Sequence, residues 1–290
     1  MRDVTPRNIG TVLDDALALY RANYKQLLFV SAIAVFPAAL AAGLAQDFYM
    51  RGFTEFAGSS AASSGAAPSD ALFATMAMSY VVMAAAAQVL MIGRAYLDSS
   101  VLRAAPGMLY RPAESGKSVL KGGLSRFGWY LLVYYVVNAI VGAAAFASFF
   151  VLGAAGIAAW VAFSLAGVIC VVEEANLIVA MKRSMALVKG NVWRMIGYLL
   201  LVGALTAAFE GALASPVIIR QIVASLQNPD AIFQPLSIGW KVAEGLTLGL
   251  AIALPAPFTP LALFSMYLDL RSRNEGMDII VRARELTPAA

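Results

Sequence analysis

Long apolar stretches without charge alternate along this chain with short clusters of basic residues. The longest stretch runs from Phe127 to Val172, 46 residues without one charged side chain. As a single helix it would measure about 69 Å at 1.5 Å per residue, roughly twice the ~30 Å hydrocarbon core of a bilayer. The run must therefore fold back on itself, and the small residues of 147–156 predict where it turns.

Composition points to the same class of protein. Hydrophobic residues make up 61% of the 290 residues and charged residues 13%, against roughly 45–50% and about 25% in soluble domains. The sequence predicts an all-α integral membrane bundle, one domain over 1–290. Six stretches reach the length of about 20 residues that a span requires: 27–45, 72–93, 127–147, 151–172, 195–214 and 246–268.

The basic clusters predict the orientation of these spans. Eighteen of the 21 Lys and Arg residues lie before the first span, between the second and third, between the fourth and fifth, and after the sixth. The positive-inside rule then places both termini in the cytoplasm. This explanation of the +4 net charge leaves no reason to expect a nucleic-acid partner. A cleavable signal peptide is the alternative for the N-terminus, but the charged lead-in is too long for one.

Two segments before spans have one apolar helix face, which is typical of helices lying in the membrane interface. They cover 8–23 and 176–190, and residues 18–23 align with residues 186–191. A weaker third copy runs from Val119 to Arg126. We expect three units, each an interfacial helix followed by a membrane hairpin; chance similarity among apolar helices is the alternative. The predicted faces are Ile9, Val12, Leu13, Ala16, Leu17 and Tyr20, and Leu177, Ile178, Met181, Met185 and Val188.

Two outer loops are expected between the spans. Residues 46–70 include the low-complexity stretch 58–65, which predicts a flexible loop. Residues 217–223 predict a short interfacial helix ended by Asn228 and Pro229. After the last span, residues 269–290 are expected to form a cytoplasmic tail.

Residue types exclude several kinds of chemistry. The chain has no histidine and one cysteine, Cys170, within an apolar run. Ser-His-Asp and Cys-His catalysis and His-ligated metals or haem are therefore excluded. We expect Cys170 to be a packing residue, and we expect no catalytic residue, cofactor or metal.

Polar residues and prolines at membrane depth are candidates for transport. An intramembrane carboxylate is costly and often functional, although Glu210 also suits an interface or helix-packing role. Prolines in the sixth span predict a kink or a break of the kind that lines transporter sites. The transport candidates are Asn138, Glu210, Glu244, Pro255 and Pro257.

Acidic and basic residues alternate where the last span ends. On a helix, Asp269 faces Arg273 and Arg271 faces Glu275, both at i, i+4, and Gly276 is a candidate helix end. With polar residues of the interfacial helices, they make up the structural or partner-facing candidates: Asp14, Arg21, Asn23, Arg183, Asn191, Tyr267, Asp269, Arg271, Arg273 and Glu275.

The stretch 267–278 resembles the signature Y-x-D-L-R-x-R-x-E-G-x-D of a bacterial multispan membrane family. That family is labelled glycerophosphoryl diester phosphodiesterase membrane domain, or uncharacterised integral membrane protein. Residues 9–23 and 180–191 resemble its opening and central motifs. The resemblance implies a multi-pass protein of the bacterial cytoplasmic (inner) membrane. The diesterase activity belongs to a separate soluble barrel with catalytic histidines, which this chain lacks, so we do not transfer it.

The leading hypothesis is a non-enzymatic accessory, assembly or bilayer-organising protein. Its expected partners are membrane lipids, with anionic headgroups at the cytoplasmic face, and other membrane subunits. The alternative is a transporter or lipid-translocating protein with a kinked sixth span. A membrane enzyme built on residues 269–275 ranks third, because the same residues suit a salt-bridged helix end.

Overall fold

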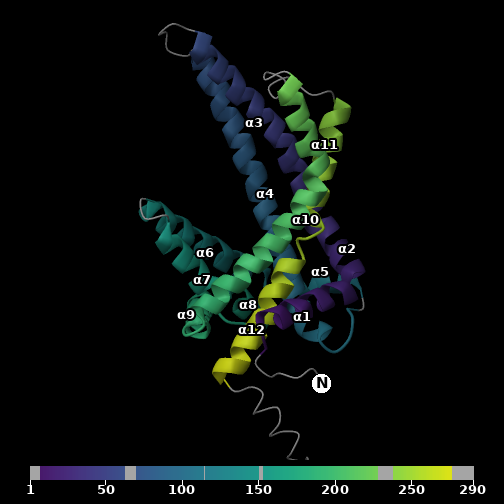
Figure 1. The fold of residues 1–290 in the computed structure, drawn as a ribbon, viewed down its shortest axis with the longest axis vertical. Helices are drawn as coiled ribbons and strands as arrows, with labels where there is room; N and C mark the ends of the chain where they lie inside the picture. Colours follow the sequence, from purple (N-terminus) through teal and green to yellow (C-terminus); the bar gives the residue numbers. More distant parts are fainter. Residues whose placement is uncertain (1–6, 63–69, 114, 150–152, 228–237, 276–290) are drawn as a thin grey trace, which may run out of the picture. The chain divides into compact units, whose positions relative to one another are not determined.

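The computed structural model describes residues 7–62, 70–113, 115–149, 153–227 and 238–275. Every regular element in these ranges is a helix (Figure 1), which confirms the predicted all-α membrane bundle. Five helices are long and apolar enough to cross a membrane, or six if one bent pair counts as a single span. The protein is a multi-pass membrane protein.

The chain forms two compact units that interleave along the sequence. Unit 1 contains Met1–Val30, Ala95–Thr206 and Pro257–Ala290, and unit 2 contains Ser31–Arg94 and Ala207–Ala256. Three helices run through both units: α2 (Tyr24–Ala34), α4 (Asp70–Met108) and α10 (Val192–Gln227). Three of the four points at which the chain passes between the units therefore lie within helices, and the fourth lies in the short break between residues 253 and 258.

The helices of unit 2 extend beyond the predicted spans. Helix α3 (Phe36–Ala62) continues through much of the expected loop 46–70, and α10 includes 217–223, where we predicted a separate interfacial helix. Both predictions were wrong because spans were ended at the first charges, and a charged side chain does not break a helix. The remaining loop residues 63–69, and Asn228 and Pro229, lie outside the described residues.

Close backbone contact holds α3 against α11 (Ile238–Ala253) in unit 2. A Cβ added to Gly43 would lie 3.4 Å from the Cα of Gly245. Helices in membranes pack closely where small residues face one another, because dispersion contacts replace the hydrophobic effect as the driving force.

Three of the predicted spans are broken helices. The first consists of α2 and α3, bent by 44°. The fourth consists of α7 (Ala154–Phe163) and α8 (Ala166–Val172), and the sixth of α11 and α12 (Phe258–Glu275). Pro255 and Pro257 lie in the last break and are buried, in agreement with the expected effect of proline on a helix. In unit 2, the Ser31 hydroxyl donates to the carbonyl of Ala253 beside this break.

The uncharged run 127–172 folds back as predicted. Helix α6 (Phe127–Ala147) coincides with the expected third span. Gly153 follows with φ 65°, a left-handed conformation that suits glycine. Helix α7 then packs against α6, since a Cβ on Gly156 would lie 2.6 Å from that of Ala145.

Unit 1 contains three short helices, α1 (Ile9–Ala22), α5 (Gly116–Leu124) and α9 (Leu177–Val188), which we call the lead-in helices. Each begins after a side-chain cap that accepts a backbone N–H, and the caps are Asn8, Ser115 and Asn176. Each then buries the fourth and eighth residues after its cap: Val12 and Ala16, Val119 and Gly123, Ala180 and Ser184. This shared pattern supports the predicted threefold repeat of a lead-in helix followed by a membrane hairpin.

The buried face of α9 differs from the predicted one. Ala180 and Ser184 are buried, whereas Ile178 and Met185 are 64% and 42% exposed. The prediction assigned the large apolar residues to one interfacial face and took no account of protein contacts. Small residues allow closer helix approach, and Ala180 and Ser184 face the protein together with Leu187 and Val188.

The lead-in helices are connected in a closed order within unit 1. Helix α5 packs on α4, where the Ser99 hydroxyl donates to the Gly123 carbonyl at 3.0 Å. Helix α9 packs on the α7–α8 break, where the Ser184 hydroxyl donates to the Ala162 carbonyl at 2.7 Å. Helix α1 packs on α12 (Figure 1). The three copies begin with α1, α5 and α9. Helix α5 thus contacts the second membrane helix of the first copy, and α9 contacts that of the second copy. Helix α1 contacts the second membrane helix of the third copy, so the last copy contacts the first. We call this arrangement the ring.

Candidate functional site

The carboxylate of Asp269 is the centre of the first polar cluster in unit 1. Its side chain is 2% exposed. One oxygen accepts from Arg194 Nη2 at 2.8 Å and from Arg273 Nε at 3.0 Å. The other accepts from the backbone N–H of Arg7 at 2.9 Å. The predicted i, i+4 pair with Arg273 is confirmed, and we call these four residues the Asp269 cluster.

Arg7 is fixed in this cluster through several of its groups. Its carbonyl accepts from Arg273 Nη2 at 2.6 Å and also from Arg194 Nη2. Its guanidinium pairs with Asp15 on α1. The segment that leads into α1 is therefore attached to α10 and α12 by charge-assisted hydrogen bonds, which are stronger than neutral ones.

A second cluster surrounds Tyr267, two residues before Asp269 on the same helix. The Tyr267 hydroxyl donates to Glu173 at 2.6 Å and accepts from Arg271 at 2.9 Å. Arg271 also donates to Glu275 at 2.9 Å, the second predicted i, i+4 pair. Arg183 pairs with both Glu173 and Glu275. We call these five residues the Tyr267 cluster; it attaches α9 to α12.

Arg183 is held as a cation in the Tyr267 cluster. Its pKa is raised above the ordinary arginine value, first by its interaction with the Glu173 side chain and further by the charge of Glu275. A permanently charged guanidinium between two carboxylates is a fastening group and has no proton to exchange near neutral pH.

A third, exposed ion pair attaches the start of α9 to its neighbours. Glu174 has φ 56°, a left-handed conformation uncommon for a residue with a side chain. Its carboxylate pairs with Arg103 of α4 at 2.7 Å and with Arg126, which precedes α6, at 3.8 Å. The side chains of Glu174 and Arg103 are 55% and 40% exposed, so water screens this pair more than the Asp269 cluster.

Two predicted asparagines follow their lead-in helices in equivalent positions. Asn23 is buried; its side chain accepts from the Ala113 N–H at 2.8 Å and donates to the Leu19 carbonyl at 2.9 Å. Asn191 donates to Asn274 at 3.3 Å. The Asn23 side chain thus bonds to the segment before α5, in the second copy, whereas Asn191 bonds to α12 within its own copy. Asp14 and Arg21, by contrast, are exposed on α1 and belong to neither cluster.

The transport candidates lie at separate places. Glu244 of α11 accepts from Gln221 at 2.8 Å and pairs with Arg220 at 3.3 Å, both on α10 in unit 2. Asn138 donates to the carbonyl one turn earlier in its own helix. Glu210 is partly exposed on α10. Within the described ranges, no three His, Cys, Asp or Glu residues come together as metal ligands would.

Sequence reasoning missed Arg7, Arg194, Glu173 and Asp98. Asp98 on α4 is 9% exposed and accepts from the Tyr130 hydroxyl at 3.1 Å. Its context, Tyr-Leu-Asp at 96–98, repeats the Tyr-Leu-Asp at 267–269. That duplicated tripeptide was the available signal for a second buried aspartate. The other three residues are far from their partners in sequence, and no local pattern identifies them.

The geometry of the Asp269 and Tyr267 clusters suits fastening. Both Asp269 oxygens accept hydrogen bonds from groups of the chain itself, and the side chain is 2% exposed, so the carboxylate is enclosed by its own partners. Two arginines share the Asp269 carboxylate, and two arginines face two carboxylates in the Tyr267 cluster. These contacts bring together α1, α9, α10 and α12. No family model matches this chain, and neither curated proteins nor solved structures include one that is similar to it.

Proposed function

We propose that this chain is a non-enzymatic protein of the bacterial inner membrane that binds anionic lipid and acts as an accessory or assembly partner of other membrane subunits. The observation that supports this proposal is the ring of lead-in helices, each capped and attached to spans by side-chain bonds or ion pairs. Such bonds hold a helix along a surface at a fixed angle, which a scaffold requires.

Helix α9 illustrates how a lead-in helix would meet lipid. Its exposed face carries Ile178 and Met185 beside Lys182 and Lys189. Trp193, at the start of α10, is 85% exposed. Large apolar side chains, lysines and an adjacent tryptophan characterise helices that lie in the headgroup region. Each lysine near an anionic leaflet contributes about 1 kcal/mol of attraction.

The proposed orientation places the lead-in helices on the cytoplasmic leaflet. The residues of α1, α5 and α9 belong to the basic clusters that the positive-inside rule assigns to the cytoplasm. Both termini would then be cytoplasmic, and the lysines of α5 and α9 would meet the anionic lipids of that leaflet.

Lipid retention tests the proposal directly. The full chain is placed in nanodiscs of phosphatidylcholine with phosphatidylglycerol, and the retained lipid is identified by native mass spectrometry. We expect enrichment of phosphatidylglycerol, reduced when Lys182 and Lys189 are both replaced by glutamine. Lys241→Gln in unit 2 is the control and should retain the enrichment. Partners are sought by cross-linking in membranes; no lipid preference together with no cross-linked subunit would refute the proposal.

One observation favours the transporter alternative. In unit 2, Ser31 of the bent first span bonds to the carbonyl of Ala253, beside the break in the sixth span. Paired broken helices at membrane depth occur at substrate sites of transporters. Flux into proteoliposomes decides this question, and flux that is unchanged by Glu210→Gln and by replacing Pro255 and Pro257 would reject transport through this region.

A further inference from the structure

Helix α6 carries a polar side chain in the middle of an apolar membrane span. Its 21 residues, Phe127–Ala147, include no charged side chain. Asn138 lies about 16 Å from the start of the helix at 1.5 Å per residue. The hydrocarbon core is about 30 Å thick, so the Asn138 amide lies close to its midplane. Neither water nor a lipid headgroup supplies hydrogen bonds at that depth.

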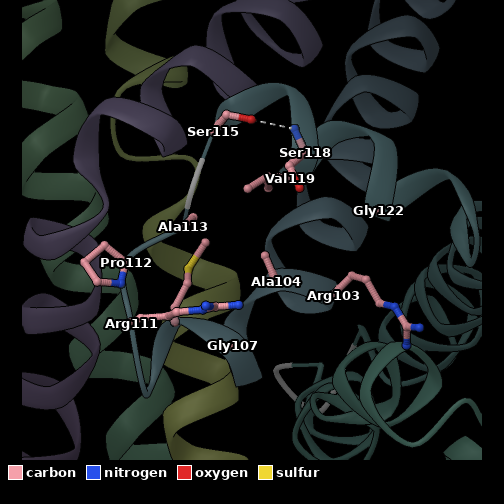
Figure 2. A pocket seen from close by; sticks show the side chains of 11 residues that line it. Arg103, Ala104, Gly107, Arg111, Pro112, Ala113, Ser115, Ser118, Val119 and Gly122 are labelled. Carbon is pink, nitrogen blue, oxygen red and sulfur yellow. Dashed lines mark hydrogen bonds between the residues drawn. The ribbon is translucent and has the colours of Figure 1, made fainter.

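Hydrogen bonds within the chain satisfy this amide only in part. The Asn138 Nδ2 donates to the carbonyl of Tyr134 at 2.8 Å, one turn earlier in α6. This bond uses one donor of the amide, and no group in the described part of the chain donates to the Oδ1. The cavity of about 320 Å³ shown in Figure 2 is lined by residues within 103–122 and does not include α6. The Oδ1 therefore needs a donor from another source.

The surface of α6 around Asn138 is open. Helix α6 packs against α7 and α8 (Figure 1), but only 11% of its apolar window is buried. Asn138 and Gly142 are both exposed, one turn apart on one helix face. A Cβ built on Gly142 meets nothing within 4 Å. A second helix thus has room to approach the backbone closely, as small residues permit in membranes.

A second copy of this chain fits that surface. Lipid tails cover exposed apolar side chains, but they form no hydrogen bond with an amide, whereas a neighbouring helix does. Two copies inserted in the same orientation are related by a two-fold axis along the membrane normal, so each residue of α6 meets its counterpart at the same depth. The carboxamide of Asn138 both donates and accepts, so it is complementary to itself. Helix α6 also brings no like charges together.

We propose that the protein forms a homodimer through α6, in which the two Asn138 side chains exchange hydrogen bonds and Gly142 allows the helices to approach. An unrelated subunit would need a matching polar group at the same depth, which this chain supplies to itself. The interface does not use the lysines of α9, so the inference is independent of the proposed lipid binding.

Energy transfer between labelled copies measures the dimer. Full chains labelled with a donor or an acceptor fluorophore are reconstituted together in phosphatidylcholine liposomes and diluted with lipid. We expect energy transfer that falls on dilution. Asn138→Leu should raise the dissociation constant of the dimer about tenfold or more, the size expected for two lost hydrogen bonds between helices. Leucine suits lipid, so the variant should keep its fold, which circular dichroism verifies.

Thr247→Val is the matched control for the loss of a polar group. The Thr247 hydroxyl also bonds to a carbonyl one turn earlier in its own helix, at an exposed position of α11. Its removal should change the dissociation constant by less than about twofold, because a bond within one helix holds no second helix.

Cross-linking locates the interface independently. Cys170, the one cysteine of the chain, is first replaced by alanine. Gly142→Cys in this background should join two copies on oxidation, because a disulfide forms only where the two Cα atoms lie within about 7 Å. Gly203→Cys on α10 is the control, since a Cβ at Gly203 also meets nothing within 4 Å, and it should give no cross-linked dimer.

Each outcome supports or rejects the dimer. The proposal fails if unchanged copies show no energy transfer, or if Asn138→Leu weakens the dimer no more than Thr247→Val. Cross-linking through Gly203→Cys but not Gly142→Cys would place the contact on α10, against the proposal. Cross-linking of Gly142→Cys only to a different protein in native membranes would show another subunit at this face and reject the second copy. None of these results alters the lipid preference tested with Lys182 and Lys189, and a missing lipid preference leaves the dimer unaffected.

Discussion

Replacing Asp269 by asparagine should destabilise the protein severely although it preserves the side chain's shape. The substitution removes the negative charge that faces Arg194 and Arg273, and it introduces an amide N–H₂ where an acceptor is required. A buried ion pair that loses one partner costs about 3–5 kcal/mol, because the other charge stays desolvated.

The structure places the expected loss at the lower end of this range. Arg194 and Arg273 are 18% and 29% exposed, so water partly solvates them once the carboxylate is neutral. We expect the free energy of unfolding to fall by about 3 kcal/mol, a shift of roughly a hundredfold in the folded-to-unfolded ratio. The control is Glu174→Gln, whose pair with Arg103 is exposed and should contribute less than about 1 kcal/mol.

Equilibrium unfolding in mixed micelles, followed by far-UV circular dichroism along a sodium dodecyl sulfate titration, measures both variants. The double variant of Asp269→Asn with Arg194→Gln should lose less than the sum of the single losses, because both remove one interaction. The reasoning fails if Asp269→Asn costs no more than Glu174→Gln. A loss of lipid binding with unchanged stability would instead assign Asp269 to a binding site.

Three further predictions use the same unfolding assay. Gly123→Ala should destabilise the protein by more than about 1 kcal/mol, because the new Cβ would lie 2.7 Å from a serine Cα of α4. The control Gly128→Ala places its Cβ in open space and should be neutral or stabilising. Equal effects of the two variants would contradict the packing of α5 on α4. Ser31→Ala should cost about 1–2 kcal/mol by leaving a carbonyl unpaired beside the break, while Thr247→Ala, whose hydroxyl bonds within its own exposed helix turn, should cost little. Burial raises the pKa of Tyr20, so the contribution of Tyr20 to stability is fully present below about pH 10 and is lost as pH rises through the raised folded-state pKa. Tyr20→Phe should therefore lose less stability at alkaline pH than the unchanged protein. Identical pH profiles of the two proteins would contradict this prediction.

The sequence was most informative where one physical requirement dominated. Lipid demands long apolar helices, so the all-α class and the fold-back of 127–172 were predictable. The ends of helices were not, because α3 and α10 continue past the charges taken as boundaries. The break at Val35 lies two residues before Pro37, which has no N–H to donate to the carbonyl of Ile33, so this bend follows from a proline that the span prediction did not use.

Within the candidate site, the sequence predicted only the ion pairs between residues one helical turn apart. The pairs of Asp269 with Arg273 and of Arg271 with Glu275 follow from i, i+4 geometry. The partners Arg194 and Glu173 come from other helices, and a single sequence carries no record of such contacts. The residues through which α9 packs on the protein were not predicted for a related reason, since hydrophobicity alone does not distinguish a lipid contact from a protein contact.

The closure of the ring has a consequence for how the protein is made. Arg7 leaves the ribosome well before its partner Asp269, which lies 262 residues later. During most of translation α1 therefore has no helix to dock on and must wait at the membrane surface. A nascent chain stopped before Asp269 would lack the partner on which α1 docks, so the attachment of α1 requires that α12 has been made.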